Sequence, residues 1–141
     1  MTRIDFHSKI PDKLGYACRL ARKAYAARAR VVLLAETPAQ AAELNEALWS
    51  LSGVDFVPHV MAGDPLAPET PVIITADEGA ELPHRDILIN LTRRTPAGFE
   101  EYARLFELIS TDTEDESAGR QRFAAYKRQA FQLDHHVAGQ S

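Results

Sequence analysis

Hydrophobic positions along the chain predict strands at four places. The segments 31–35, 72–75 and 86–91 are dominated by valine, isoleucine and leucine. Such runs are typical of parallel strands that are covered on both faces. Residues 3–7 instead alternate apolar and polar positions, which predicts a further strand that is half buried.

Two amphipathic helices are predicted between these strands. The first carries apolar residues at helical spacing from Leu14 to Tyr25, with most of its basic residues off that stripe. The second follows Thr37 and Pro38, which suit the cap and the first position of a helix, and its apolar stripe ends at Leu51.

Two more helices are predicted in the last third of the chain. Apolar residues recur at helical spacing over residues 95–109, after Thr95-Pro96. A last helix is predicted over residues 117–133, where the preceding acidic segment favours a helix N-terminus. The alternation of strands and helices predicts an α/β fold of three layers, α/β/α, with a mostly parallel sheet and a Rossmann-like architecture.

Composition is that of an ordinary globular chain. The 141 residues are 45% hydrophobic and 26% charged, and they suit a single domain spanning residues 1–141. No apolar stretch approaches the ~20 residues that a membrane span needs, and the first residues lack the apolar core of a signal peptide. We therefore expect a cytoplasmic protein.

Charge is distributed unevenly. The net charge is −4, yet residues 1–36 carry eight basic against three acidic side chains, and residues 37–118 carry four against sixteen. A protein that wraps nucleic acid is usually basic overall. We therefore expect no direct nucleic-acid binding, although a basic first helix keeps that alternative open, and we expect local attraction of an acidic partner.

Residue patterns for catalysis, cofactors and metals are weak. The first predicted strand-to-helix turn, residues 8–12, lacks the glycines of a nucleotide-binding loop. Cys18 falls on the apolar stripe of the first helix, and His135 and His136 are adjacent at the predicted end of the last helix. The sequence thus predicts no enzyme, cofactor or metal site. The alternative is a small-molecule-binding or enzymatic α/β domain that uses the proline-rich loop 53–71.

Two stretches suggest protein binding. Trp49 and Phe56 either fill the core or form an exposed aromatic patch for a partner, since aromatics dominate interface hot spots. On the last helix Arg120, Phe123 and Lys127 share one face by helical spacing. This face suits an acidic peptide with an apolar end, but a solvated basic helix with inward-facing aromatics gives the same pattern.

Several blocks, in this order, carry a family resemblance. They are residues 44–49 (LNEALW), 56–59 (FVPH) with 62–63 (AG), 71–73 (PVI), 85–91 (RDILINL), and the Arg-x-Arg-aromatic pattern from Arg120 through Tyr126 and Lys127 to Phe131. Together they resemble the chi subunit family of the bacterial DNA polymerase III holoenzyme. The resemblance implies a non-enzymatic accessory subunit of the clamp-loader complex. Such a subunit binds the acidic C-terminal tail of single-stranded DNA-binding protein and is linked to the replisome through the psi subunit.

The resemblance also implies the binding residues. Arg120 matches a family arginine of the tail site, and Phe123 stands where the family can have tyrosine. Ala124 and Glu116 stand where the family can have lysines, which predicts weaker tail binding. Arg122, Lys127 and Arg128 are our candidates to replace the lost cations. Trp49 and Phe56 match aromatics that face psi in the family, and where psi is absent the partner would be another replication or repair protein.

Overall fold

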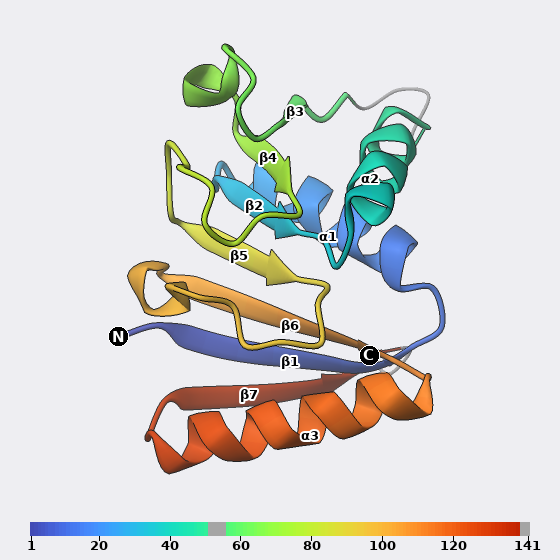
Figure 1. Ribbon diagram of the computed structural model, residues 1–141, viewed down its shortest axis with the longest axis vertical. Coiled ribbons are helices and arrows are strands. Elements are labelled where there is room, and N and C mark those ends of the chain that lie inside the picture. The colour runs from blue at the N-terminus through green and yellow to red at the C-terminus, as the bar shows by residue number, and fades with distance from the viewer. Residues whose placement is uncertain (51–55, 139–141) are drawn as a thin grey trace.

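Seven strands form one sheet in the order β3-β4-β2-β5-β6-β1-β7 (Figure 1). The computed structural model describes residues 1–50 and 56–138. The strands are β1 (Arg3–Ile10), β2 (Val31–Leu34), β3 (His59–Met61), β4 (Val72–Thr75), β5 (Ile87–Asn90), β6 (Arg104–Ser110) and β7 (Gln132–Val137). Every strand pairing within the described residues is parallel.

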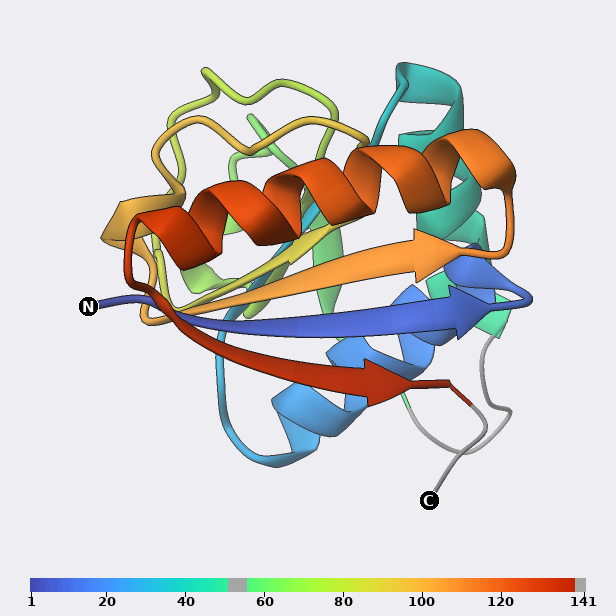
Figure 2. The ribbon, with the colours of Figure 1, turned by 90° about the horizontal axis from the view of Figure 1, so that it is seen from below.

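Three helices complete the layers. They are α1 (Lys13–Ala26), α2 (Pro38–Ser50) and α3 (Thr113–Arg128). The buried residues of α1 and α2 join one apolar cluster, whereas Tyr126 of α3 joins a second cluster with Phe6 and Phe99. The two clusters lie on opposite faces of the sheet, and Figure 2 shows α3 and α1 on either side of the strands. The predicted three-layer α/β/α, Rossmann-like fold is confirmed.

Local sequence explains how α2 begins. Thr37 Oγ1 accepts a hydrogen bond from the backbone N–H of Gln40 at 3.1 Å, and the Gln40 side chain accepts one from the Glu36 N–H at 2.7 Å. The first bond satisfies one of the amide groups that a helix N-terminus leaves without partners, and the second ties the residue before the cap to the first turn. The predicted start of this helix is confirmed, while Leu51, the predicted end of its apolar stripe, lies outside the described residues.

The helix predicted over residues 95–109 is wrong. Gly98 adopts a left-handed backbone (φ 74°), Phe99–Glu101 forms a single 3₁₀ turn, and Arg104–Ser110 is strand β6. β6 is a central strand whose residues belong to apolar clusters on both faces of the sheet, so its apolar residues do not alternate with polar ones. The spacing of the apolar residues in this segment therefore happens to match that of an amphipathic helix.

The predicted last helix is also displaced. It begins at Thr113, with Asp112 as its cap, and ends at Arg128. Ala130 has a positive φ of 64°, which turns the chain back, and β7 then pairs with β1 at the edge of the sheet. His135 and His136 thus lie on a strand, contrary to the helix end predicted for them.

The segment predicted as the proline-rich loop 53–71 contains regular secondary structure. It contains β3 and a 3₁₀ turn, Ala67–Glu69, whose Ala67 is buried against the sheet. Residues 53–55 of this predicted loop lie outside the described residues.

A buried carboxylate joins α3 to the sheet. Glu107 of β6 has no exposed surface, and Arg122 of α3 is 4% exposed. Glu107 accepts hydrogen bonds from Arg122 Nη2 at 3.1 Å, Tyr126 Oη at 2.7 Å and Asn90 Nδ2 at 2.8 Å. Burial raises the pKa of Glu107, whereas Arg122 and the two neutral donors favour its charged form.

Replacing Arg122 by methionine tests this network. Arg122→Met leaves Glu107 buried without its cation, and we expect a loss of about 3 kcal/mol in unfolding free energy. The matched control is Lys127→Met on the same helix, where the side chain is exposed and we expect a change within about 0.5 kcal/mol. Urea denaturation measures both, and equal midpoints for the two variants would contradict a structural role for the Glu107–Arg122 pair.

Candidate functional site

The residues of α3 that face the sheet determine which residues lie on the adjacent side of the helix. The buried residues of α3 are Asp115, Gly119, Arg122 and Tyr126. One residue further on is a rotation of about 100° around a helix. The residues one position later are Glu116, Arg120, Phe123 and Lys127. They form a second stripe along the side of the helix, half-buried or exposed.

The first three residues of this second stripe line a groove of about 460 Å³. The rest of the lining comes from Phe6 and Lys9 of β1, Ile109 of β6 and His135 of β7. Parallel pairing of β1 with both β6 and β7 brings these residues together from distant parts of the chain. We call this feature the α3 groove.

The floor of the α3 groove is apolar. The ring centroids of Phe6 and Phe123 lie 5.1 Å apart in an edge-to-face arrangement. Ile109 is 6% exposed beside them. Gly119 lets Ile109 pack directly against the α3 backbone, because a Cβ there would stand 2.3 Å from Ile109 Cδ1. The floor can therefore receive an apolar side chain.

The rim of the α3 groove is charged. Arg120 is exposed, and in the part of the chain that the structure describes it has no carboxylate partner. Lys9, in contrast, forms an ion pair with Glu116 across the groove. Ser8 Oγ lies 2.7 Å from His135 Nε2 at the β7 side. The groove thus combines an apolar floor with two cations and one carboxylate.

The predicted tail-site residues separate into three positions. Arg120 and Phe123 lie in the α3 groove. Arg122 is buried, and its guanidinium binds Glu107 and the carbonyl oxygen of Arg93, the latter at 2.8 Å. Lys127 and Arg128 are exposed in the last turn of α3, beyond the groove lining.

Trp49 and Phe56 form a second candidate surface. Each is 57% exposed, and their ring centroids lie 5.2 Å apart. Both rest on His59, which is 6% exposed, and Trp49 meets its ring at 4.9 Å. The His59 ring nitrogens lie 2.7 Å and 3.2 Å from the carbonyl oxygens of Val57 and Asn45, so this imidazole holds the patch against α2. This exposure excludes the core interpretation of the two aromatics, while their role in binding a partner stays a prediction.

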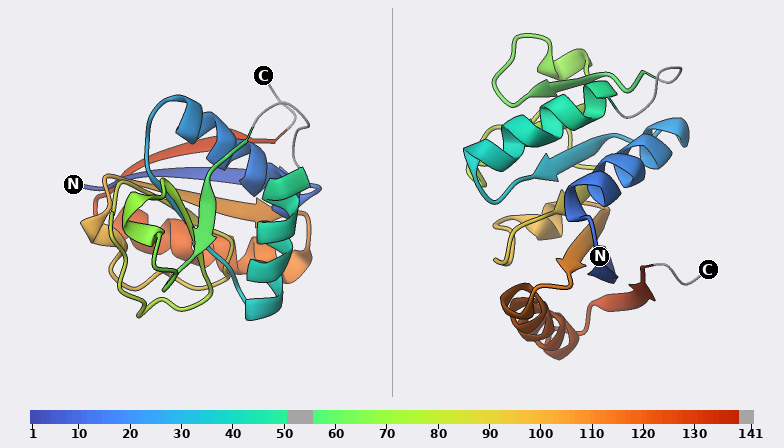
Figure 3. Two further views of the ribbon diagram at one scale, coloured as in Figure 1. Left: turned by 90° about the horizontal axis from the view of Figure 1, so that it is seen from above. Right: turned by 90° about the vertical axis from the view of Figure 1, so that its right-hand side faces the viewer.

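The two surfaces are far apart on the fold. α2 packs beside β3 and β4, whereas α3 packs on β6 and β7, at the other end of the sheet (Figure 3). They also lie on opposite faces, because α2 and α3 belong to different apolar clusters. The arrangement lets two partners bind without competing for space.

The carboxyl ends of the central strands, where this class of fold usually binds ligands, hold a pocket of about 520 Å³ lined by Lys13, Glu36, Arg93 and Asp115, all of which are engaged in ion pairs. Arg94 pairs with Glu36 at 2.5 Å and Glu78 at 3.2 Å. Arg93 pairs with Asp112 at 2.8 Å and Glu114 at 3.0 Å. These cations already have carboxylate partners, which an incoming phosphate would have to displace.

The remaining candidates for catalysis and metal binding are Cys18 and possible groups of His, Cys, Asp or Glu side chains. Cys18 is fully buried in α1, and burial raises the pKa of its thiol to about 11. Among residues 1–50 and 56–138, no three His, Cys, Asp or Glu side chains are grouped so as to hold a metal ion. No helix in the same ranges is long and apolar enough to cross a membrane.

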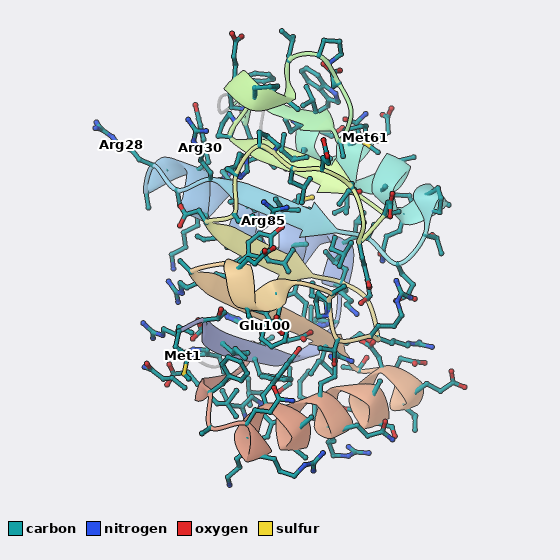
Figure 4. The ribbon with its side chains drawn as sticks, turned by 60° about the vertical axis from the view of Figure 1, so that its left-hand side comes forward. Met1, Arg28, Arg30, Met61, Arg85 and Glu100 are labelled. Carbon is teal, nitrogen blue, oxygen red and sulfur yellow. The ribbon has the colours of Figure 1, made fainter. Side chains whose placement is uncertain are left out.

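Several basic residues of the first third of the chain lie at the two ends of the sheet. Lys9 and Lys13 lie where β1 ends and α1 begins. Arg28 and Arg30 project from the opposite end, at which β2 begins, with Arg85 nearby (Figure 4). Arg19, Arg22 and Lys23 lie between these ends on α1 and line one pocket, so direct nucleic-acid binding through the first helix stays an untested alternative.

These features define a Rossmann-like α/β protein with two exposed surfaces suited to partner proteins. The comparison with protein families gives the particular family. Residues 1–134 match the family model described as DNA polymerase III chi subunit, HolC. The chain belongs to this family, and the predicted resemblance is confirmed.

Individual relatives agree. The chain is 37% identical over 140 residues to a DNA polymerase III subunit chi of Pseudomonas aeruginosa, and 96% of each chain is covered. It is 29% identical over 117 residues to the protein of that name from Haemophilus influenzae, which covers 83% of this chain and 81% of the relative. The corresponding Escherichia coli protein is 28% identical, with 83% and 80% covered. The protein is thus a subunit of the DNA replication machinery.

Truncation of the Trp49 side chain tests whether this ring contributes to the stability of the fold. Because Trp49 is more than half exposed, we expect Trp49→Ala to lower the unfolding free energy by about 1 kcal/mol or less. The neighbouring Leu48 is 2% exposed, and Leu48→Ala should cost about 2–5 kcal/mol. Thermal or urea unfolding measures both, and a loss for Trp49→Ala as large as that for Leu48→Ala would show that the ring serves the core.

Proposed function

We propose that this chi family member is a non-catalytic adaptor with two protein-binding surfaces. The α3 groove binds the acidic C-terminal tail of single-stranded DNA-binding protein. The surface of Trp49 and Phe56 binds the psi subunit, or another replication or repair protein, and so links the tail to the clamp-loader complex. The adaptor works in the cytoplasm, where the bacterial chromosome is replicated.

The α3 groove carries the first half of this proposal. An acidic tail that ends in an apolar residue and a free carboxylate needs a cation and an apolar pocket. Arg120 supplies a guanidinium that can hold a carboxylate through two parallel hydrogen bonds. Phe6, Phe123 and Ile109 supply the apolar floor. Charge and shape therefore fit this ligand within a single groove.

Two departures from the family pattern lower the expected affinity. Ala124, exposed one position after Phe123, and Glu116 stand where the family can have lysines. An exposed ion pair contributes only about 0–1 kcal/mol, so these changes weaken binding without abolishing it. A disordered tail also loses conformational entropy when it binds, and we expect a micromolar dissociation constant, about −8 kcal/mol.

The exposed aromatics support the second half. Large aromatic side chains are enriched at the centres of protein interfaces. Trp49 and Phe56 pack against each other and against His59, and such contacts lower the conformational entropy that is lost when a partner binds. The distance between this surface and the α3 groove suits an adaptor that holds two proteins at once.

A peptide titration tests the tail site. The ligand is a peptide copying about ten C-terminal residues of the organism's single-stranded DNA-binding protein, titrated by calorimetry at low and high salt. We expect salt-sensitive binding, because charge attraction is a large share of it. Arg120→Ala should weaken binding about tenfold, since it removes a paired hydrogen-bonding cation.

The matched control is Arg128→Ala, which removes the same charge from the same helix outside the groove lining. We expect it to change the affinity less than twofold. Failure of the folded wild-type protein to bind the peptide at low salt would refute the tail site, and equal losses for the two variants would refute its placement in the α3 groove.

A further inference from the structure

The ion pair between Lys9 and Glu116 bears directly on access to the α3 groove. Lys9 comes from the end of β1 and Glu116 from the first turn of α3, and both line the groove with Arg120. The Lys9 side chain is 60% exposed, whereas that of Glu116 is 21% exposed. The lysine can therefore exchange its partner without any rearrangement of the core.

The backbone at Lys9 directs this side chain. Lys9 has a φ of 57°, in the left-handed region that non-glycine residues seldom adopt. The pairing of β1 with β6 shifts register between His7 and Ile10, so Lys9 sits on an irregularity of the strand. Such irregularities re-aim a side chain relative to a regular strand. Here the result is a cation that reaches the groove from the sheet side.

Glu116 has a cation on each side. It meets Lys9 across the groove, and Arg120 follows it by four residues, which places the two on neighbouring turns of one helix face. While Glu116 holds Lys9, an acidic ligand meets Arg120 as the only groove cation that is not paired among the described residues. A ligand carboxylate that takes the place of Glu116 gains the second cation.

We propose that Lys9 is a ligand-binding cation of the α3 groove and that Glu116 is its internal competitor. In the free protein the Glu116 carboxylate pairs with Lys9, and on binding a carboxylate of the acidic tail replaces Glu116 in that pair. This inference rests on the proposed tail-binding function. It explains how a groove that carries a glutamate at its rim accepts an acidic peptide, and it makes Glu116 the residue that limits affinity.

A double-mutant cycle tests the competition. Glu116→Gln frees Lys9 and removes a repulsive charge, and we expect the tail peptide to bind about fivefold more tightly at low salt. Lys9→Ala should weaken binding about twofold in the wild-type background, where Glu116 already occupies the lysine. In the Glu116→Gln background the same change should cost about fivefold, because Lys9 then serves the ligand alone.

The charge control is Glu114→Gln, which makes the same change of net charge in the same helical turn. Glu114 pairs with Arg93 and does not line the groove, so we expect less than a twofold effect. Unfolding midpoints of all variants verify that each is folded.

The outcomes separate the two proposals. Equal effects of Lys9→Ala in both backgrounds, or equal effects of Glu116→Gln and Glu114→Gln, overturn the competition while binding that depends on Arg120 retains the tail site. Absence of peptide binding by both the wild-type protein and Glu116→Gln overturns the tail site itself.

Discussion

The orientation of α3 depends on a carboxylate that has no contact with solvent. Glu107 lies on β6 and accepts hydrogen bonds from Arg122 and Tyr126, which are one turn apart on α3. Leaving a charge of this kind without its partner costs several kcal/mol, so the helix is strongly held in one rotation about its axis. Because Arg122 and Tyr126 point inward, Phe123 and Arg120 face sideways. The composition of the α3 groove thus follows from a pairing in the core.

A rigid sheet separates this groove from the Trp49 surface. The strands between them are buried on both faces, and their side chains are packed with helices on each side. Nothing in this arrangement requires one surface to move when the other is occupied. The fold therefore acts as a spacer between the two surfaces, as the proposed adaptor function requires.

Prediction from sequence succeeded where a segment has one dominant environment. The central strands β2, β4 and β5 are uniformly apolar, and α1 and α2 have clear apolar stripes, so their patterns identify them. The prediction missed β6 because burial on both faces removes the alternation of apolar and polar residues that marks a strand. It missed β7 because that strand is polar and lies at the edge of the sheet. Its pairing with β1 is a long-range contact that no local pattern announces.

The residues of the candidate site also differ in whether the sequence could predict them. Arg120 and Phe123 could be found because they share a helix, where spacing alone places them on one side. Lys9, Ile109 and His135 were missed because only the parallel register of β1, β6 and β7 brings them to that helix. Burial of Arg122 was also invisible in the sequence, since an arginine beside an aromatic residue on a basic helix resembles a surface residue until Glu107 is seen beneath it.

The ion pairs at the carboxyl ends of the strands make this edge a poor site for an anionic ligand. In Rossmann-like proteins a glycine-rich turn lets phosphate approach the N-terminus of the first helix. Here the first turn of α1 is capped by the Asp12 carboxylate, which accepts a hydrogen bond from the Gly15 N–H at 3.1 Å. Nearby, Lys13 is bound to the buried Asp115 at 2.9 Å. An anion at this edge would meet a carboxylate in the place that phosphate needs, whereas the α3 groove offers Arg120 unpaired among the described residues. The same architecture therefore uses its customary ligand edge to hold α1 and α3 together, and the two surfaces that we propose for partner binding lie at the margins of the sheet.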